Sequence, residues 1–260
     1  MHVVLDGPRT LNAQGPGTWA ALAAAGRSLP PGTRVVVLRG AGRAFSSGLD
    51  RAAMPLLAEL GARPAEEAAA QVAGYQEAFT CWRAAGVLSV AAVHGPAVGA
   101  GFQLALACDL RLVADTASFR MAETSLGLVP DLAGTAPLVR AVGEAAAIEI
   151  CLTGRPVGAE EAVRLGLARA RVPEAELEQA TDDLVQAVLA APAAATAATL
   201  DLLRGAAGRA DVEQRQRERT AQVRLLRGLV GAPGAPDGPT GTPPGTGPAD
   251  GAEGPGPARR

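Results

Sequence analysis

Hydrophobic residues gather in four short runs in the first half of the chain. These runs are rich in β-branched residues and leucine, and they predict buried strands at 2–6, 34–40, 87–95 and 109–115. Between the first two, apolar residues recur at helical spacing and stop at a Pro-Pro-Gly sequence, which predicts a crossover helix. Further helices are expected at 65–85 and 99–108. Strands that alternate with helices predict an α/β fold with a largely parallel sheet.

Helical patterns dominate from residue 144 onward. We expect helices at 144–153 and 159–166, then in the stretch that begins "VPEAELEQ", and finally at 192–229. Opposite charges three and four positions apart in the last helix indicate a solvated face. Residues 231–260 are almost wholly glycine, proline and small polar residues, which predicts a disordered tail. The expected division is therefore a core at 1–143, a helical region at 144–230 and a tail at 231–260.

Composition and charge exclude several classes of function. The 260 residues are 48% hydrophobic, enough for a sizeable core, and carry a net charge of −2 with 3% aromatic residues. Nucleic-acid binders need a basic face or stacking platforms, so no nucleic-acid partner is expected. No apolar run is long enough to span a bilayer and the N-terminus lacks a signal-peptide pattern. We therefore predict no membrane partner and a cytoplasmic location.

The residues available for chemistry narrow the choice further. The chain contains no lysine, which excludes a Walker-type phosphate loop and Schiff-base chemistry. Only His2 and His94 are histidines, and the three cysteines are far apart, so buried thiols are expected and a metal site is not. Gly99-Ala100-Gly101 fails as a dinucleotide fingerprint because Leu104 occupies the third glycine position. A G-x-S-x-G nucleophile elbow is also absent.

Two glycine-containing turns are the remaining candidates for a site. One turn precedes the apolar helix at 99–108, and the other, "AFSSGLD" at 44–50, follows the second predicted strand. Glycine lets backbone approach a ligand, and a helix start presents unpaired N–H donors. If the turns meet, two N–H groups could bind one oxygen that gains negative charge, as in an oxyanion hole. Taken alone, each turn is more often a case of ordinary helix capping.

Three motifs in register give this chain a family resemblance. "AFSSGLD" at 44–50, "GPAVGAGFQLALACDLRLVAD" at 95–115 and "FRMAETSLGLVPDLAG" at 119–134 resemble the enoyl-CoA hydratase/isomerase (crotonase) family. The segment 152–173 resembles the one that follows in that family, so the resemblance covers roughly residues 3–230. It implies a spiral of ββα units, then helices that build a homotrimer or a dimer of trimers. Compared with the family, the chain begins almost inside the first matched strand. Two explanations remain open: the chain lacks an edge strand, or its start codon is misplaced.

The resemblance also implies the site. The substrate would be an acyl-CoA thioester, with no other cofactor and no metal, and the N–H groups of Ser47 and Ala100 would form the oxyanion hole. Asp50 is expected to fix its turn, and the variable region 51–75 would flank the acyl group. The implied substrate- and CoA-binding residues are Ser46, Ser47, Gly48, Leu49, Asp50, Gly99, Gly101 and Gln103.

The catalytic side chains depart from the pattern of the family's hydratases. Those enzymes use two glutamates, at positions that match Gln103 and Glu123. An amide neither gives nor takes a proton at neutral pH, so Gln103 puts hydration in doubt. Asp131 matches an aspartate that some isomerases of the family carry, and Glu123 with Asp131 forms a possible acid–base pair. This set of residues favours double-bond isomerisation, with lyase or other enolate chemistry as variants within fatty-acid metabolism.

Other readings of the same residues remain open. Asp131 after Pro130 is a good turn residue, Glu123 could be a surface carboxylate, and Gln103 could be a satisfied core amide. A non-catalytic acyl-CoA-binding protein on the same fold is the main alternative to an enzyme. A thioester hydrolase or a decarboxylase is a more distant possibility. The residues do not specify the acyl group.

Overall fold

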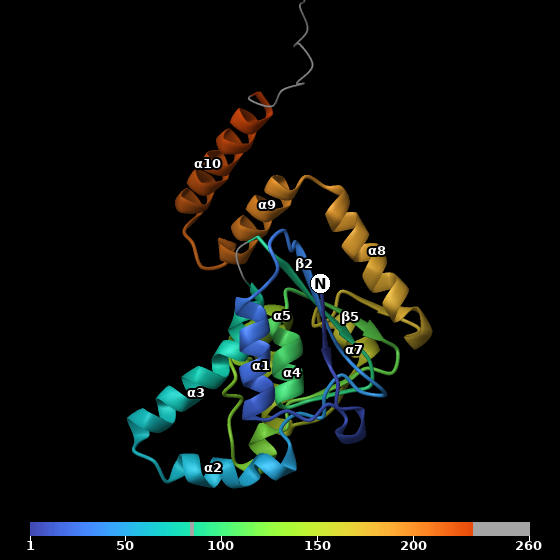
Figure 1. The fold of residues 1–260 in the computed structure, drawn as a ribbon, viewed down its shortest axis with the longest axis vertical. Helices are drawn as coiled ribbons and strands as arrows, with labels where there is room; N and C mark the ends of the chain where they lie inside the picture. Colours follow the sequence, from blue (N-terminus) through green and yellow to red (C-terminus); the bar gives the residue numbers. More distant parts are fainter. Residues whose placement is uncertain (84–85, 231–260) are drawn as a thin grey trace, which may run out of the picture.

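The core of the protein is a five-stranded parallel sheet in the order β1-β2-β3-β5-β8 (Figure 1). The computed structural model describes residues 1–83 and 86–230. The strands are His2–Leu5 (β1), Val35–Gly40 (β2), Leu88–Val93 (β3), Leu110–Ala114 (β5) and Ala170–Val172 (β8). The first four lie where the hydrophobic runs predict them, and all neighbours pair in parallel.

A smaller second sheet contains strands that the sequence pattern did not predict. Its order is β4-β6-β7, formed by Pro96–Val98, Ser118–Arg120 and Val157–Gly158, with the last pair antiparallel. Segments of two or three residues give no measurable hydrophobic period, so only their tertiary pairing reveals them. Strand β4 follows β3 after two residues, which brings the chain directly to the start of α4.

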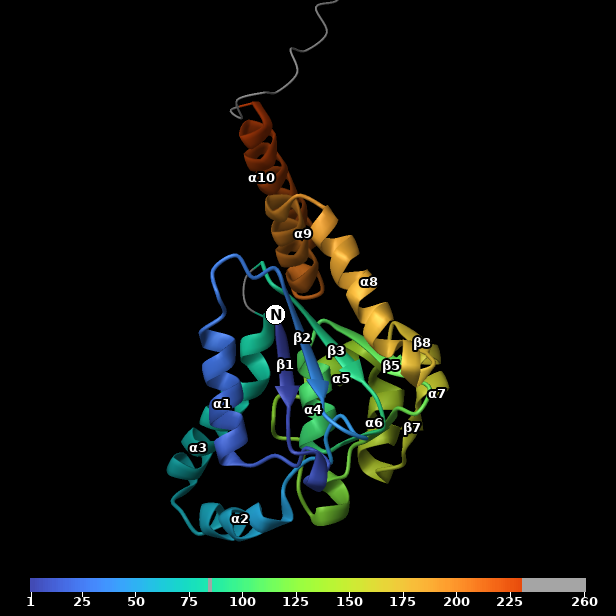
Figure 2. The ribbon, with the colours of Figure 1, turned by 45° about the vertical axis from the view of Figure 1, so that its right-hand side comes forward.

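The alternation of side chains along β2 divides the core into two layers. Val36 and Leu38 face the larger apolar cluster, against α1 (Pro16–Arg27), α3 (Ala65–Thr80) and α4 (Ala100–Ala107). Val35 and Val37 face the opposite cluster, where they pack with α8 (Leu177–Ala190). Figure 2 shows α1 and α3 on one side of the sheet and α8 on the other. This two-sided burial explains why the strands are continuous apolar runs.

Helix α4 is the best-buried helix of the core. Each of its eight residues is buried, including the amide of Gln103. Phe102 packs on Phe119 of β6 with ring centroids 5.0 Å apart. A helix buried on all sides carries no amphipathic stripe, so its sequence is apolar throughout. The N-terminus of this helix is consequently held rigidly at one edge of the core.

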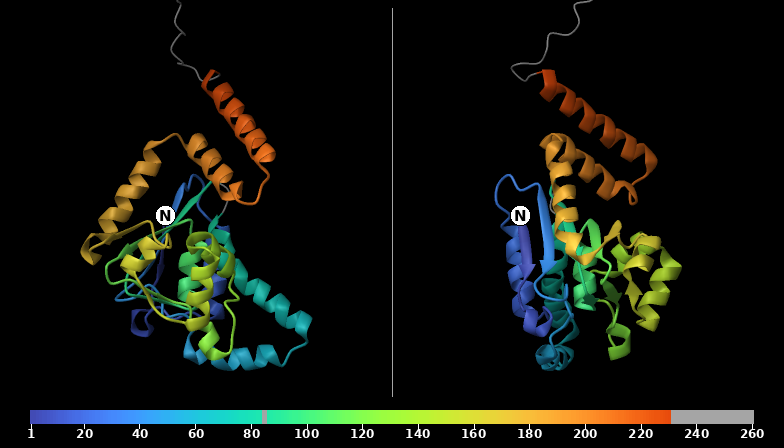
Figure 3. Two further views of the ribbon diagram at one scale, coloured as in Figure 1. Left: turned by 180° about the vertical axis from the view of Figure 1, so that it is seen from behind. Right: turned by 90° about the vertical axis from the view of Figure 1, so that its right-hand side faces the viewer.

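The structure corrects two expectations about helices. Residues 51–75, for which no helix was expected before 65, contain α2 (Met54–Gly61) ahead of α3. The predicted helix 192–229 is two helices, α9 (Ala193–Ala206) and α10 (Asp211–Val230), separated at a segment that includes Gly208. α10 packs on α9 and projects from the end of the molecule that lies farthest from α2 (Figures 1 and 3). Glycine lowers helix stability enough for the chain to turn there.

The remaining helices complete the main core. They are α5 (Thr135–Val142), α6 (Glu144–Thr153) and α7 (Ala159–Arg164), with short 3-10 turns at Pro8–Thr10, Arg51–Ala53, Cys81–Arg83, Glu123–Leu126 and Glu174–Glu176. The larger apolar cluster includes Ile150 and Leu167, so the predicted boundary at 143/144 falls inside a shared core. The predicted tail, 231–260, lies outside the described residues.

Within the described residues, no single helix is long and apolar enough to cross a bilayer. In that part of the chain, one pair of helices reaches the required length and composition together, Glu174–Ala190 with Ala193–Ala206, and it is bent by 109°.

Candidate active site

The N-terminus of α4 rests on a backbone conformation that only glycine adopts easily. Gly99, the residue before the helix, has φ 49° and ψ −117°. A side chain at this position would also begin 3.2 Å from Oε1 of Glu123. As the first helical residue, Ala100 has no intrahelical acceptor for its N–H, and it has none elsewhere in the described part of the chain. The turn therefore presents an available donor beside a carboxyl group.

The second glycine turn lies against the first. Val98 N–H donates to the carbonyl oxygen of Ser46 at 2.9 Å, and Ser46 also pairs with Ala97 as an isolated parallel bridge. A side chain at Gly48 (φ 86°) would start 2.4 Å from the Val98 oxygen and 3.5 Å from the Ala100 nitrogen. The two motifs, more than 40 residues apart in the chain, thus meet at the start of α4.

Gly101 completes this close approach. A side chain on Gly101 would begin 2.5 Å from the carbonyl oxygen of Ser46. Only a residue without a side chain lets α4 pack this tightly on the 44–50 turn. Gly48, Gly99 and Gly101 are therefore needed for the geometry of the site, whatever ligand the site binds.

Two buried polar residues that sequence reasoning missed hold the 44–50 turn. Asn12 is 2% exposed, and its Nδ2 donates to the carbonyl oxygens of Ala44 and Phe45 at 2.8 and 3.3 Å. Gln14 is fully buried, and its Nε2 donates to Ser46 Oγ at 2.9 Å. The available signal was the pair of amides in "LNAQG", at the start of the segment between the first two predicted strands.

The implied binding residues of the turn differ in what they can offer a ligand. Ser46 is fully buried, and its hydroxyl donates to the Asn12 carbonyl oxygen and accepts from Gly48 N–H. Asp50 accepts from Ala52 N–H at 2.9 Å and so caps the following 3-10 turn. Leu49 forms a parallel bridge with Gln14. The side-chain oxygens of Ser46 and Asp50 therefore form hydrogen bonds to other groups of the protein itself.

The N–H of Ser47 already has an acceptor. It donates to the carbonyl oxygen of Leu11 at 2.8 Å, and the Ser47 hydroxyl donates to the Thr10 oxygen at 3.0 Å. Leu11 has a left-handed backbone with φ 56°. The structure thus brings Ser47 and Ala100 to neighbouring turns, but only the Ala100 donor is uncommitted. A ligand oxygen would have to share or replace the Leu11 bond.

Glu123 is a buried carboxyl group beside these turns. It follows β6 at the start of a 3-10 turn and is 8% exposed, which excludes the reading as a surface carboxylate. Its Oε1 accepts from Gln103 Nε2 at 2.7 Å. Its Oε2 is buried without a hydrogen-bond partner in the described structure. One carboxyl oxygen is thus held in place and the other is available for chemistry.

Burial and a neighbouring charge adjust the acidity of Glu123. Loss of hydration raises the pKa of its carboxyl group above the ordinary value, and the negative charge of Asp131 adds to the rise. The hydrogen bonds of the carboxyl group, including the one from Gln103, oppose this rise but do not cancel it. A carboxyl group with a raised pKa is closer to the operating pH of a general base or acid.

Asp131 lies at an exposed position in the loop between Glu123 and α5. Partial loss of hydration raises the pKa of its carboxyl group. The loop is anchored on both sides, because Gln76 Nε2 donates to the Asp131 carbonyl oxygen at 2.7 Å and Leu132 N–H donates to Gln103 Oε1 at 2.9 Å. Gln103 bonds both Glu123 and the N–H of Leu132, the neighbour of Asp131, so the two predicted acid–base residues lie in one region.

The described residues contain no group of three or more side chains suited to hold a metal ion. The thiols of Cys81 and Cys108 have pKa values that burial raises to about 11 and about 12, so they stay protonated at neutral pH. The groups of the site that can take part in chemistry include the carboxyl groups of Glu123 and Asp131 and the Ala100 backbone donor.

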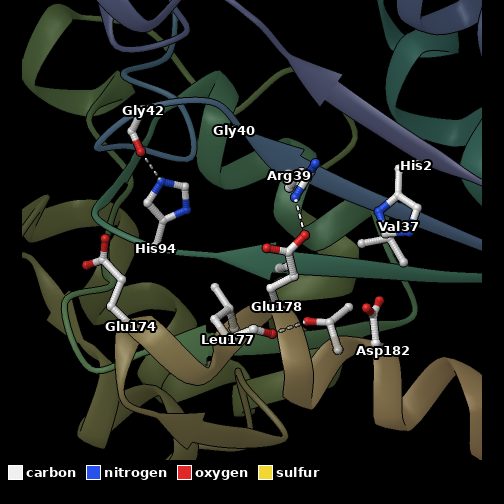
Figure 4. A pocket seen from close by; sticks show the side chains of 12 residues that line it. His2, Val37, Arg39, Gly40, Gly42, His94, Glu174, Leu177, Glu178 and Asp182 are labelled. Carbon is white, nitrogen blue, oxygen red and sulfur yellow. Dashed lines mark hydrogen bonds and ion pairs between the residues drawn. The ribbon is translucent and has the colours of Figure 1, made fainter.

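A separate pocket lies on the opposite face of the five-stranded sheet. It is lined by Val37 and Leu177, which belong to the α8 side of the core, together with charged residues of β2 and α8 (Figure 4). Some of its polar side chains are paired: the His94 ring bonds the Gly42 carbonyl oxygen at 2.7 Å, and Arg39 contacts Glu178 at 3.1 Å, whereas Arg39 Nε is buried without a partner in the described structure. Sheet and helix separate this pocket from Glu123, so it is no part of the candidate site.

Comparison with known proteins establishes the class. The model of the enoyl-CoA hydratase/isomerase family matches residues 1–227. The chain therefore belongs to the enoyl-CoA hydratase/isomerase family, and the resemblance drawn from the three motifs is confirmed.

Particular relatives follow from sequence and from structure. A carnitinyl-CoA dehydratase of Escherichia coli (strain K12) is 40% identical over 157 residues, which is 60% of this chain and 58% of that protein. The chain spans about half to two thirds of the length of the curated relatives it matches.

Solved structures confirm the α/β crotonase fold over most of the chain. An enoyl-CoA hydratase homologue from Thermobifida fusca YX, in complex with CoA, is 46% identical with a TM-score of 0.83, over 89% of this chain and 91% of that one. A second complex, with acetoacetyl-CoA, is 43% identical with a TM-score of 0.83, over 87% and 91%. An enoyl-CoA hydratase from Bacillus anthracis is 27% identical with a TM-score of 0.77, over 87% and 86%.

Proposed function

We propose that this protein is an enzyme that acts on an acyl- or enoyl-CoA thioester through an enolate. The observation that carries the proposal is the buried, unpartnered Oε2 of Glu123 next to the Gly99–Ala100 turn. The homologue in complex with CoA and acetoacetyl-CoA supports a thioester ligand. In this arrangement a carboxylate faces the carbon whose proton is removed, while a backbone donor binds the adjacent oxygen.

The proposed reaction is a shift of a double bond. Glu123 Oε2 removes a proton from C2 of a 3-enoyl thioester, and the electron pair moves to the thioester oxygen to form a dienolate. A proton then returns to C4 from the Glu123 or the Asp131 carboxyl group, which leaves the 2-enoyl thioester. One carboxylate can remove and return the proton, so no second glutamate is needed. Hydration would need two groups that flank a water, and Gln103 supplies no second acid or base.

The backbone donors stabilise the charge on the thioester oxygen. Ala100 N–H lies at the N-terminus of α4, where the helix dipole also favours negative charge. Ser47 N–H joins it when the bond to the Leu11 oxygen is shared or released. Each such donor is worth about 3–4 kcal/mol in the transition state. The proposed oxyanion hole is therefore half formed in the described arrangement and completed by the substrate oxygen.

The decisive experiment compares the wild-type protein with Glu123→Gln. Both are incubated in deuterated water with saturated, 2-enoyl- and 3-enoyl-CoA thioesters, and deuterium at C2, hydration and double-bond migration are measured. We expect deuterium exchange and migration in the wild type, and a loss of about 10²–10⁴-fold in the variant, because it keeps the shape but lacks the base. Glu160→Gln, an exposed position in α7 and outside the region 51–75, is the matched control and should retain full activity.

A second candidate function rests on Gln103. A family member that has lost one catalytic carboxylate could bind acyl-CoA without transforming it. In that case the wild type would bind the thioesters but incorporate no deuterium at C2. Exchange in the wild type that persists in Glu123→Gln would instead assign the base to another residue.

We also propose a homo-oligomer, the trimer or dimer of trimers implied by the family. The C-terminal helices expose large apolar side chains, including Leu203 at 68%, Val212 at 70% and Leu229 at 67%. Exposed apolar side chains on these helices would be available for contacts between copies of the chain. Light scattering on the purified chain measures the mass, and a monomer at micromolar concentration would overturn this proposal.

A further inference from the structure

Gln103 is the one polar side chain on α4, and both ends of its amide are used. Its Oε1 accepts from Leu132 N–H at 2.9 Å and from Gly134 N–H at 3.3 Å. Its Nε2 donates to Glu123 Oε1 at 2.7 Å. The residue is 1% exposed. The amide therefore joins the carboxyl group to the loop that contains Asp131.

The two backbone donors determine which way the amide points. An amide oxygen accepts hydrogen bonds, whereas an amide nitrogen only donates them. If the amide were flipped, its NH₂ group would face two N–H donors and its oxygen would face the carboxylate. The backbone of residues 132–134 thus forces the NH₂ group toward Glu123.

The Gln103 side chain also packs closely against Gly134. A side chain at Gly134 would begin 2.7 Å from Cγ and 2.9 Å from Oε1 of Gln103. The Gln103 amide therefore lies directly on the backbone of the loop. An ionised glutamate in the same place could accept from both N–H groups but could not donate to Glu123.

We propose that Gln103 is a positioning residue that holds Glu123 as the single base of the site. The amide fixes Oε1 and so directs Oε2 toward the substrate, and its hydrogen bond stabilises the ionised carboxylate that removes the proton. This inference rests on the proposed function. It goes beyond that function because it assigns the Gln103 amide a role in catalysis. If Gln103 were only the remnant of a lost catalytic carboxylate, it would have no such role.

The pH dependence of the rate distinguishes this role from a purely structural one. The base acts only when it is deprotonated, so the acid limb of the rate profile follows the pKa of Glu123. The hydrogen bond from Gln103 favours the charged form, so its removal raises that pKa and moves the limb to higher pH. A hydrogen bond to a charged group is strong enough to move the limb by roughly one to two pH units.

The test measures double-bond migration of a 3-enoyl-CoA from pH 5 to pH 9 in wild type, Gln103→Met and Gln103→Glu. We expect the acid limb to move up in both variants, and further in Gln103→Glu, because a second negative charge is added. At any pH on the acid limb, the rate should fall about tenfold when the limb moves up by about one pH unit. Gln179→Glu, the same change at an exposed position of α8, is the control and should leave the limb in place.

Gly134→Ala provides a second route that keeps the amide. The added methyl group displaces Gln103, so the acid limb should again move up. Circular dichroism on each variant verifies the fold. Unchanged acid limbs in folded Gln103→Met and Gly134→Ala would overturn the positioning role while leaving the proposed function intact. Absence of C2 deuterium exchange in the wild type would instead overturn the proposed function.

Discussion

Two buried carboxyl groups of this protein have opposite environments. Asp109, at the start of β5, accepts hydrogen bonds from Ser89 N–H and Ser89 Oγ at 2.9 and 2.7 Å, and from Arg204 Nε at 2.9 Å. Burial opposes its ionisation, but the bonds from Arg204 and Ser89 prevail and the pKa of Asp109 is lowered. Glu123 has the Gln103 donor and one unpartnered oxygen, and its pKa is raised.

The contrast separates a carboxylate that stabilises the fold from one that is available for chemistry. Asp109 joins α9 to the N-terminal ends of the interior strands β3 and β5, since Arg204 also donates to the Val87 oxygen. Each of its oxygens is saturated, so it has no capacity to exchange a proton at neutral pH. Glu123 keeps one free oxygen at a cost to stability. Buried carboxyl groups of this second kind are typical of functional sites.

The largest expected effect on stability comes from Arg204→Met. The substitution leaves the Asp109 charge buried without its main partner, which costs about 3–5 kcal/mol. Urea unfolding of the purified protein measures the loss. Combining Arg204→Met with Asp109→Asn should recover part of it, because the stranded charge is removed. A loss below about 1 kcal/mol in the single variant would show that Asp109 does not have the structural role assigned to it.

Gly99→Ala should affect both the fold and the site. Its left-handed backbone would be strained by about 1–3 kcal/mol, and the new methyl group would crowd the Glu123 carboxyl group. We expect activity to fall more than stability, measured by double-bond migration beside thermal unfolding. Gly17→Ala is the control, because it lies in α1 with open space around it. That variant should be neutral or slightly stabilised.

The two carboxyl groups should give stability opposite dependences on pH. The lowered pKa of Asp109 means that its contribution is present above the unfolded value and lost as pH falls through the folded pKa. The raised pKa of Glu123 means that the native state holds its proton more tightly, so stability falls as pH rises from the ordinary 4.5 toward the folded pKa. Glu123→Gln should abolish only the second dependence, as measured by unfolding at a series of pH values. Asp131, whose pKa is also raised, should leave a residual fall, so an undiminished falling limb in this variant would contradict the assignment.

The smallest effect is expected on the exposed face of α10. Arg217 and Glu213 form an i, i+4 pair at 3.0 Å, with side chains 54% and 52% exposed. Arg217→Ala should cost about 0.3–0.5 kcal/mol, and less at high salt. Urea unfolding at low and high ionic strength checks this. A loss comparable with that of Arg204→Met would show that exposure does not explain the difference between the two ion pairs.

Much of the fold could be predicted from local patterns. The four main strands and α4 lie within two residues of their predicted ends, because apolar runs and glycine turns are local signals. The break between α9 and α10 was missed because the charged, helix-favouring sequence on both sides masked Gly208. Strands β4, β6, β7 and β8 were missed because each has only two or three residues and exists through its partners.

For the site, the sequence by itself determined the residue types: glycines at the start of a buried helix, one amide on it, and a carboxyl group twenty residues later. Only the tertiary structure decided what these groups contact. In the folded chain the Ser47 N–H donates to the Leu11 oxygen, and Glu123 is buried with one free carboxyl oxygen. The NH₂ group of Gln103 points toward Glu123. These outcomes depend on backbone donors and acceptors from distant segments, and backbone groups are the same at every position of a sequence, so no residue pattern records their pairing.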